Sequence, residues 1–237
     1  MTRLTLCLLV GILAAVSLSR SADVEQFEGV VKLTAETVFA EHVIVGKDTI
    51  AISAEARAMA QTASQQLYME FRFRPELFRV ISNLDMIESD DIYQLSNNRR
   101  LHYSYDSTAY LVDAFDAWDG RVEDIQVLDD TLTVLGRSCR GIQVTMFRGK
   151  DSKPEILRFY ADTTLYIDPA QFENVKYEGW GAIIGALRGM PLLMECVLPG
   201  VSGLELRFKA VEIRHAQENE RLFWPKNGAR IIDNFKH

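Results

Sequence analysis

The sequence predicts a mainly β protein of the α+β class, in which one large antiparallel sheet is covered by two or three short helices. Three observations support this prediction. Apolar and polar residues alternate with a period of two along much of the chain, which is typical of strands with one buried face. Helix-forming stretches are few and short. No linker or internal repeat divides the 237 residues, a length that suits one domain.

The first strand patterns lie between Val30 and Ser82. Residues 30–37 form a β-branched run that is typical of a strand. Over residues 69–74, Met and Phe alternate with Glu and Arg; Pro75 then interrupts the pattern, which resumes at residues 78–82. Because proline cannot donate to a β-ladder, this interruption predicts a turn or a bulge.

The middle and late parts of the chain continue the same pattern. Residues 92–95 and 101–105 flank an asparagine-rich turn and predict a hairpin. Further strands are predicted over residues 108–114, 127–135, 139–147, 156–160, 192–198 and 204–215. Together these segments make about ten strands, and an open sheet of that size must curl.

Three segments favour helix. Residues 53–66 are rich in Ala, Gln and Glu and begin at a serine suited to capping. Asp168 and Pro169 combine an N-cap residue with proline at the first helical position. Residues 180–187 are apolar and predict a short buried helix. Apolar helices that are so few usually cover an open face of a sheet.

The first twenty-two residues predict a secretory signal peptide. Arg3 precedes an uncharged run from Leu6 to Val16, and small residues follow up to Ala22. This run is shorter than the ~20 apolar residues that a membrane span needs. Cleavage after Ser19 or Ser21 fits better than cleavage after Ala22; the alternative is an uncleaved anchor. We therefore expect a protein that is periplasmic or otherwise exported, and whose single domain spans residues 23–237.

Export leaves two cysteines, Cys139 and Cys196. An oxidising compartment permits a disulfide between them, and the alternative is two buried thiols that act as small apolar residues. Two thiols and four scattered histidines do not suggest a zinc site, so we expect no metal.

Charge and motifs exclude several function classes. The net charge of −7 is unfavourable for binding a nucleic-acid backbone. The chain contains no G-x-S-x-G nucleophile elbow, no H-E-x-x-H zinc motif and no phosphate- or dinucleotide-binding glycine pattern. His102 and His215 lie among polar neighbours on predicted strands, which favours surface or sheet-edge positions over catalytic ones. We therefore expect no cofactor and no enzyme activity.

Apolar and aromatic residues are concentrated in the central sheet and in the late helix. The simple interpretation of each is a place in the core. The alternative is the wall of a ligand cavity, because a curled sheet under a thin helical cover can leave an apolar hollow. The candidates for such a wall are Phe71, Phe73, Tyr93, Tyr103, Tyr105, Trp180, Ile184, Leu187, Met190, Leu193 and Met194. A wider set with the same character adds Phe78, Tyr110, Phe115, Trp118 and Ile183.

Five short motifs carry a resemblance to a known family. They are Phe27–Val31, the step Val134–Gly141, Leu165–Pro169, Gly189–Leu192 and Phe223–Pro225. They resemble motifs of exported proteins of the lipoprotein-carrier-like (LolA/LolB-like) superfamily, and most closely those of an uncharacterised branch common in Bacteroidetes. The resemblance covers residues 27–227. The chain departs from the family pattern at Arg137, Ser138 and Met190, and in an insert over residues 48–66.

The resemblance implies an unclosed β half-barrel capped by helices, whose hollow carries acylated lipoproteins in the best-known members. The first hypothesis is thus a non-enzymatic carrier of a lipid or a lipoprotein acyl chain, with a membrane-associated partner that receives the ligand. The second is an exported interaction module whose barrel is filled by its own side chains. The third is an enzyme without a readable motif, which a cleft with converging charges would favour.

Overall fold

The computed structural model describes residues 25–83, 88–104, 109–114, 118–150, 152–197, 201–217, 219–225 and 229–233. The predicted signal peptide lies outside these ranges, as do Tyr105 and Phe115. In the part of the chain that is described, no helix is both long enough and apolar enough to cross a membrane.

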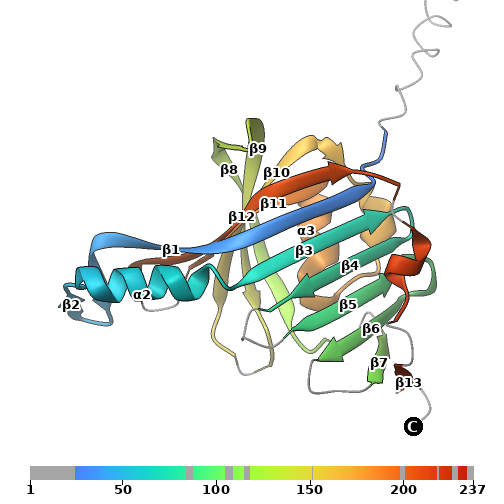
Figure 1. Cartoon of the computed structure of the whole chain (residues 1–237), viewed down its shortest axis with the longest axis horizontal. Coiled ribbons are helices and arrows are strands. Elements are labelled where there is room, and N and C mark those ends of the chain that lie inside the picture. Colours follow the sequence, from blue (N-terminus) through green and yellow to red (C-terminus); the bar gives the residue numbers. More distant parts are fainter. Residues whose placement is uncertain are drawn as a thin grey trace, which may run out of the picture.

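The described residues form one curved sheet of thirteen strands (Figure 1). The strands are β1 (Gly29–Val45), β2 (Asp48–Ile50), β3 (Tyr68–Arg74), β4 (Leu77–Ser82), β5 (Ser89–Gln94), β6 (Arg99–Ser104), β7 (Ala109–Ala114), β8 (Arg121–Val134), β9 (Arg137–Phe147), β10 (Glu155–Tyr166), β11 (Gly189–Val197), β12 (Val201–His215) and β13 (Arg230–Asp233). Their order is β13-β7-β6-β5-β4-β3-β1-β12-β11-β10-β9-β8, and β2 pairs with β1 off this path. Because the order ends in two different strands, the sheet is an unclosed half-barrel, as predicted.

Two details of the sheet differ from the prediction. The sequence predicts about ten strands that are all antiparallel, but β13 runs parallel to β7. Strands β2 and β13 have only three and four residues, too few for a period-two pattern to stand out. They were therefore not predicted from the sequence.

The predicted turns are confirmed by backbone geometry. The interruption at Pro75 is a tight turn between β3 and β4, in which Glu76 has φ of 69°. Asn98 adopts a left-handed conformation with φ of 52° between β5 and β6. Leu135 and Gly136, at 50° and 75°, join β8 to β9; two positive φ values in a two-residue hairpin loop match the twist of the strands.

Helix α2 (Ala54–Ser64) begins at Ser53, whose side chain accepts a hydrogen bond of 3.1 Å from the backbone N–H of Ala56. This helix lies beside the far end of β1, where β1, β2 and β12 extend beyond the barrel as an arm (Figure 1). The insert over residues 48–66 therefore builds β2 and α2.

Helix α3 (Trp180–Leu187) lies on the concave face of the sheet, behind the strands in Figure 1. It follows two 3₁₀ turns, η2 (Pro169–Phe172) and η3 (Tyr177–Gly179). Asp168 caps η2 by accepting a hydrogen bond from Ala170, so the predicted N-cap is confirmed, although the helix is a single 3₁₀ turn. Together these elements form the predicted helical cover.

The core has two parts. The larger part fills the concave side, where Phe71 and Phe78 meet the ring of Trp180 at centroid distances of 5.5 and 5.6 Å, and it also includes a few side chains on the other face of the sheet, such as Leu193. The smaller part includes Ile92, Leu101, Tyr110, Val112 and Phe223. Tyr93 belongs to the first part and its neighbour Ile92 to the second, as expected from the alternation of side chains along a strand.

A buried ion pair fixes the C-terminal segment over the convex face. Arg79 binds both carboxylate oxygens of Asp90, at 2.7 and 2.6 Å, and also donates to the backbone carbonyl of Leu222 in η4 (Glu220–Phe223). The hydroxyl group of Tyr110 donates to the same carboxylate. The polar atoms under η4 are thus satisfied, while Phe223 covers the smaller core.

The two cysteines are free thiols, so the disulfide considered from the sequence is wrong. Cys139 lies on β9 and Cys196 on β11, with β10 between them. Cys196 and Val144 both face Leu157 of β10, which leaves Cys139 five residues further along β9, about 17 Å away. A disulfide needs Cα atoms within about 7 Å of each other. The alternative of two separate buried thiols is the arrangement observed.

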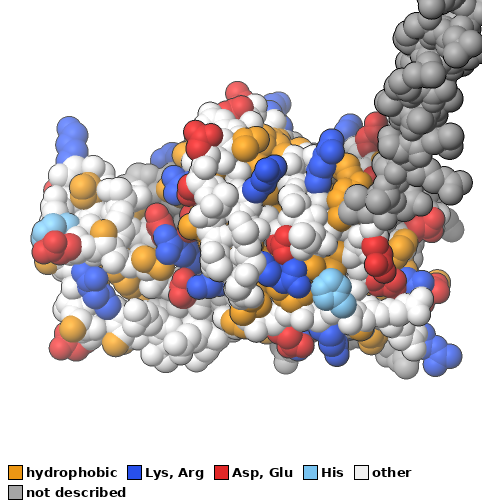
Figure 2. All heavy atoms as spheres, turned by 90° about the horizontal axis from the view of Figure 1, so that it is seen from above, with side chains coloured by type: hydrophobic (Ala, Val, Ile, Leu, Met, Phe, Trp, Pro, Cys, Tyr) orange, Lys and Arg blue, Asp and Glu red, His pale blue; other side chains and the backbone are white. Residues whose placement is uncertain are grey.

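The surface carries charges of both signs. Figure 2 shows that Lys and Arg side chains are interspersed with Asp and Glu on the visible face, with apolar side chains between them.

Candidate ligand-binding cavity

An inner cavity of ≈400 Å³ lies between the concave face of the sheet and the helical cover formed by η3 and α3. Its walls combine strands from both halves of the sheet with the helix. The lining residues are Met69, Val80, Ser82, Ser89, Asp91, Arg100, His102, Met146, Arg148, Leu157, Phe159, Tyr177, Glu178, Trp180, Ile183, Met194, Cys196 and Phe208. A cavity of this size is within the range of small-molecule sites.

The apolar part of the wall comes from six strands and α3. Met69, Met146 and Met194 project from β3, β9 and β11, and all are buried. Thioether side chains have several rotatable bonds and repack easily around guests of different shape. The indole ring of Trp180 and the side chain of Ile183 complete this wall from α3.

The other end of the cavity is polar. Arg100, whose side chain is 5% exposed, pairs with the carboxylate of Asp91 at 2.6 Å. Nδ1 of His102 lies 2.9 Å from the same carboxylate oxygen. The guanidinium group of Arg100 also stacks on the ring of Tyr177, 3.5 Å from its centroid, which attaches η3 to β6. These contacts hold Asp91, Arg100 and His102 in one fixed arrangement.

Arg148 and Glu178 form the second half of the polar end. Nη1 of Arg148 lies 3.6 Å from the carboxylate of Glu178, and its Nε donates to Glu155 at 2.8 Å. Glu178 has a left-handed backbone with φ of 50°, a strained conformation for a residue with a Cβ atom. Burial raises the pKa of Glu178, and the charge of Asp91 adds to this increase, whereas Arg148, Arg100 and His102 oppose it.

The polar end is balanced in charge and can both donate and accept hydrogen bonds. Two guanidinium groups, from Arg100 and Arg148, face two carboxyl groups, from Asp91 and Glu178. The guanidinium groups donate hydrogen bonds and the carboxylate groups accept them. This arrangement suits a polar head that is uncharged or zwitterionic.

One polar atom in the wall has no partner. Nε1 of Trp180 is buried and makes no hydrogen bond to any described residue. A buried N–H without a partner costs about 1–3 kcal/mol of free energy, and buried indole N–H groups usually find an acceptor. Because Trp180 lines the inner cavity, a ligand oxygen could supply the acceptor.

Charges converge in the cavity, as the enzyme hypothesis expects, but the thiol among its described lining residues is not activated as a nucleophile. Burial raises the pKa of the Cys196 thiol, although Arg148 opposes the shift, and a protonated thiol is a weak nucleophile. Ser82 and Ser89 face each other across β4 and β5, with their hydroxyl oxygens 2.8 Å apart. Across the ranges that the structure describes, no three His, Cys, Asp or Glu side chains are placed to hold a metal ion.

The predicted wall residues fall into four groups. Trp180 and Met194 line the inner cavity. Seven others belong to the larger core without lining the cavity: Phe71, Phe73, Tyr93, Ile184, Leu187, Met190 and Leu193. Tyr103 packs against the smaller core, with its ring 5.1 Å from that of Tyr110. Tyr105 lies outside the described residues.

Two placements follow from the alternation of side chains along strands. Leu193 precedes Met194 on β11, so its side chain points to the face opposite the cavity. Tyr103 follows His102 on β6 in the same way, and His102 lines the cavity rather than the outer surface. Only the structure shows which face of these strands is concave.

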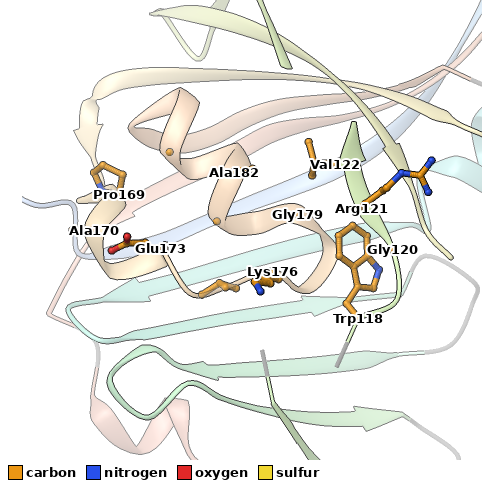
Figure 3. Close-up of a pocket in the computed structure, with 13 residues that line it drawn as sticks. Trp118, Gly120, Arg121, Val122, Pro169, Ala170, Glu173, Lys176, Gly179 and Ala182 are labelled. Atoms are coloured by element: carbon orange, nitrogen blue, oxygen red, sulfur yellow. The ribbon is translucent and has the colours of Figure 1, made fainter. Parts of the chain in front are cut away.

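A second, outer cavity of ≈680 Å³ lies on the other side of α3 (Figure 3). Its lining residues are Trp118, Gly120, Arg121, Val122, Pro169, Ala170, Glu173, Val175, Lys176, Gly179, Gly181, Ala182 and Gly185. Trp118 and Ile183, both in the wider apolar set from the sequence, therefore lie in different cavities.

No protein-family model and no curated protein matches the chain. Among solved structures, it is similar to an uncharacterized conserved protein from Thermus thermophilus, with 11% identity over 93% of this chain and 99% of that chain and a TM-score of 0.41. It is also similar to a LolA superfamily protein from Nitrosomonas europaea, with 9% identity over 84% of this chain and 91% of that chain and a TM-score of 0.32. These likenesses concern the fold alone, and the Bacteroidetes branch stays a prediction.

Proposed function

We propose that the chain is an exported, non-enzymatic binding protein that holds a lipid-like ligand in the inner cavity. The acyl chain would lie against the methionine and aromatic wall, and a polar head of no net charge would lie at the end formed by Asp91, Arg100, His102, Arg148 and Glu178. The export step rests on the signal peptide predicted over residues 1–22.

The observation that carries this proposal is the unpartnered indole N–H of Trp180 in the cavity wall. An ester or amide carbonyl at the start of an acyl chain would accept its hydrogen bond. Each buried CH₂ group would add about 0.8 kcal/mol. The incomplete barrel, whose edge strands β8 and β13 do not pair with each other, leaves a route for such a ligand to enter and leave.

The arm supports a second candidate, an interaction module. Ile44, Val45, Ile50 and Met59 expose 41%, 43%, 42% and 74% of their surface on the arm, away from both parts of the core. Exposed apolar side chains on a projecting element can contribute to a contact surface for another protein. In this role the arm could also bring the chain to a partner that delivers or receives the ligand.

A pair of matched variants tests the ligand site. Ser82 faces the inner cavity, whereas Ile81 lies next to it and points to the opposite face of β4. Ser82→Phe should fill the polar side of the cavity, and Ile81→Phe adds the same ring outside it. Both proteins would be incubated with a di-acylated peptide and with a lysophospholipid, then examined by native mass spectrometry and solvent extraction.

We expect a lipid adduct on the unaltered protein and on Ile81→Phe, and its loss from Ser82→Phe. Circular dichroism of each variant verifies the fold. An equal adduct on Ser82→Phe and Ile81→Phe would show that the lipid binds elsewhere. A bare mass for the unaltered protein with every lipid would contradict the proposal and favour the interaction module.

A further inference from the structure

We infer that the outer cavity is a second binding site, which accepts a single-chain amphiphile with an anionic head, such as a carboxylate or a phosphate monoester. This inference does not depend on what fills the inner cavity. It rests on how α3 separates the two cavities, on the small residues of its outer face, and on the charges around the outer opening.

Helix α3 is the wall between the two cavities. Its large side chains, Trp180 and Ile183, face the inner cavity. The opposite side of the helix presents Gly181, Ala182 and Gly185 to the outer cavity. The helix therefore has an apolar surface on both sides, and the outer side is a smooth floor without projecting side chains (Figure 3).

Packing explains one of these glycines but not the other. A Cβ atom at Gly181 would lie 2.5 Å from the backbone oxygen of Phe172 and 2.6 Å from that of Val175, so the turn before α3 requires glycine there. A Cβ atom at Gly185 would meet nothing within 4 Å. Glycine inside a helix lowers stability by about 1 kcal/mol relative to alanine. At Gly185 the missing side chain makes the outer cavity deeper.

The far wall of the outer cavity is held by local packing. Trp118 lies over Gly120, where a Cβ atom would come within 2.2 Å of the indole ring. Val122, at the start of β8, lies next to Gly179. A Cβ atom on Gly179 would lie 2.6 Å from a methyl group of Val122. Figure 3 shows Trp118 and Arg121 at one end of the cavity and Pro169 and Ala170 at the other.

The charges around the opening favour an anionic head. Lys176 and Arg121 carry positive charges and Glu173 a negative one. Arg121 stacks on Phe147 and pairs with Glu123 at 3.1 Å. Lys176 is exposed, and no ion pair joins it to another described residue, so its ammonium group remains available. Figure 3 shows Glu173 toward the Pro169 end and Lys176 between it and Trp118. An anionic head near Lys176 would place the chain along the floor of α3.

The three tryptophans allow a direct test, because Trp118 lines the outer cavity, Trp180 lines the inner cavity, and Trp224 lies in neither lining. A protein with Trp118 alone, made by Trp180→Phe and Trp224→Phe, would be titrated with stearate that carries a nitroxide near its carboxyl group. The nitroxide quenches only an indole close to it. The methyl ester of the same probe is the uncharged control.

We expect saturable quenching of Trp118 by the anionic probe, and affinity about three- to fivefold lower for the methyl ester and for Lys176→Gln, as expected for one solvent-exposed charge pair. Gly185→Leu, which fills the floor, should abolish quenching. The matched variant Ala186→Leu places the same side chain on an exposed position of α3 that does not line the cavity, and should leave quenching unchanged.

Three results would overturn the inference. The first is the absence of saturable quenching of Trp118. The second is equal quenching in Gly185→Leu and Ala186→Leu, since the probe would then lie outside the cavity. The third is equal affinity for the acid and its methyl ester, which would show that the site does not prefer an anionic head group. Ser82→Phe fills the inner cavity and leaves the outer cavity unaltered. Added to the protein with Trp118 alone, it should therefore leave the quenching of Trp118 unchanged.

Discussion

Asp162 illustrates how a buried carboxylate is held at the irregular centre of β10. It is 5% exposed and accepts hydrogen bonds from Arg137 at 2.7 Å and from the backbone N–H and hydroxyl group of Thr164 at 2.8 and 2.7 Å. Burial raises the pKa of Asp162, but these donors outweigh it and the net pKa is lower than usual. The carboxylate thus fixes the point where β10 and β11 change register.

Asp162→Asn should therefore destabilise the protein in a pH-dependent way. A carboxyl group with a lowered pKa in the folded state contributes stability above its unfolded pKa of about 3.9, and this contribution disappears as the pH falls through both values. We expect a loss of about 1–2 kcal/mol at pH 7, since the partly exposed Arg137 limits the ion-pair contribution.

Urea unfolding of the unaltered protein and of Asp162→Asn between about pH 3 and 7 would test this, with the exposed Asp48→Asn as control. The stability difference should narrow on the acid side. A difference that stays constant or widens as the pH falls would contradict the assigned role of Asp162.

At the same scale, the polar residues of the inner cavity show the limit of sequence-based prediction. His102 and Glu178 lie 76 positions apart along the chain and meet only because η3 folds back over β6. No motif joins them, and His102 among polar neighbours looks like a surface residue. The wall residues Trp180 and Met194 could be predicted because their large apolar side chains favour buried positions.

At the scale of elements, α3 provides a matched pair of glycine substitutions. Gly185→Ala should stabilise the protein by about 0.5–1 kcal/mol, because alanine favours helix and its methyl group meets open space. Gly181→Ala should destabilise it, because the methyl group would be forced against the backbone oxygens of Phe172 and Val175.

Thermal unfolding of the two variants would measure both effects on one helix. Opposite shifts in the melting temperature are expected, by a few degrees upward for Gly185→Ala. Shifts of the same sign would mean that the packing around α3 differs from that described.

Elements with a clear pattern could be predicted from the sequence, and those without one could not. Residues 69–74 alternate so regularly that the strand and its buried face are both evident. In contrast, every residue from Gly189 to Glu195 on β11 is buried, so the pattern does not reveal that Met194 faces the cavity and Leu193 the other side. The short parallel strand β13 depends on a partner more than a hundred residues away.

At the scale of the whole molecule, the fold follows from an imbalance between the sheet and its cover. The concave face of a large, curved sheet is apolar and must be covered by other elements. The short helix α3 and its two 3₁₀ turns cover only part of it. The remaining space is the inner cavity on one side of α3 and the outer cavity on the other. The convex face is covered separately by the C-terminal segment through Phe223 and Arg79.

The fold class could be predicted from the sequence, because many segments with strand periodicity and few helical segments indicate a mainly β protein. The two cavities were not, because their existence depends on how far α3 lies from the strands. Trp118 and Ile183 are both large apolar residues in the sequence, yet Trp118 lines the outer cavity and Ile183 the inner one.

The central claim is that a ligand oxygen binds the indole N–H of Trp180 in the inner cavity. The most direct measurement is a proton–nitrogen correlation NMR spectrum of the protein, recorded with and without a di-acylated peptide. The three indole signals would be assigned by their loss in Trp→Phe variants. We predict that the Trp180 N–H signal moves downfield at saturation while that of exposed Trp224 stays in place. A Trp180 signal that does not move at saturation would contradict the account.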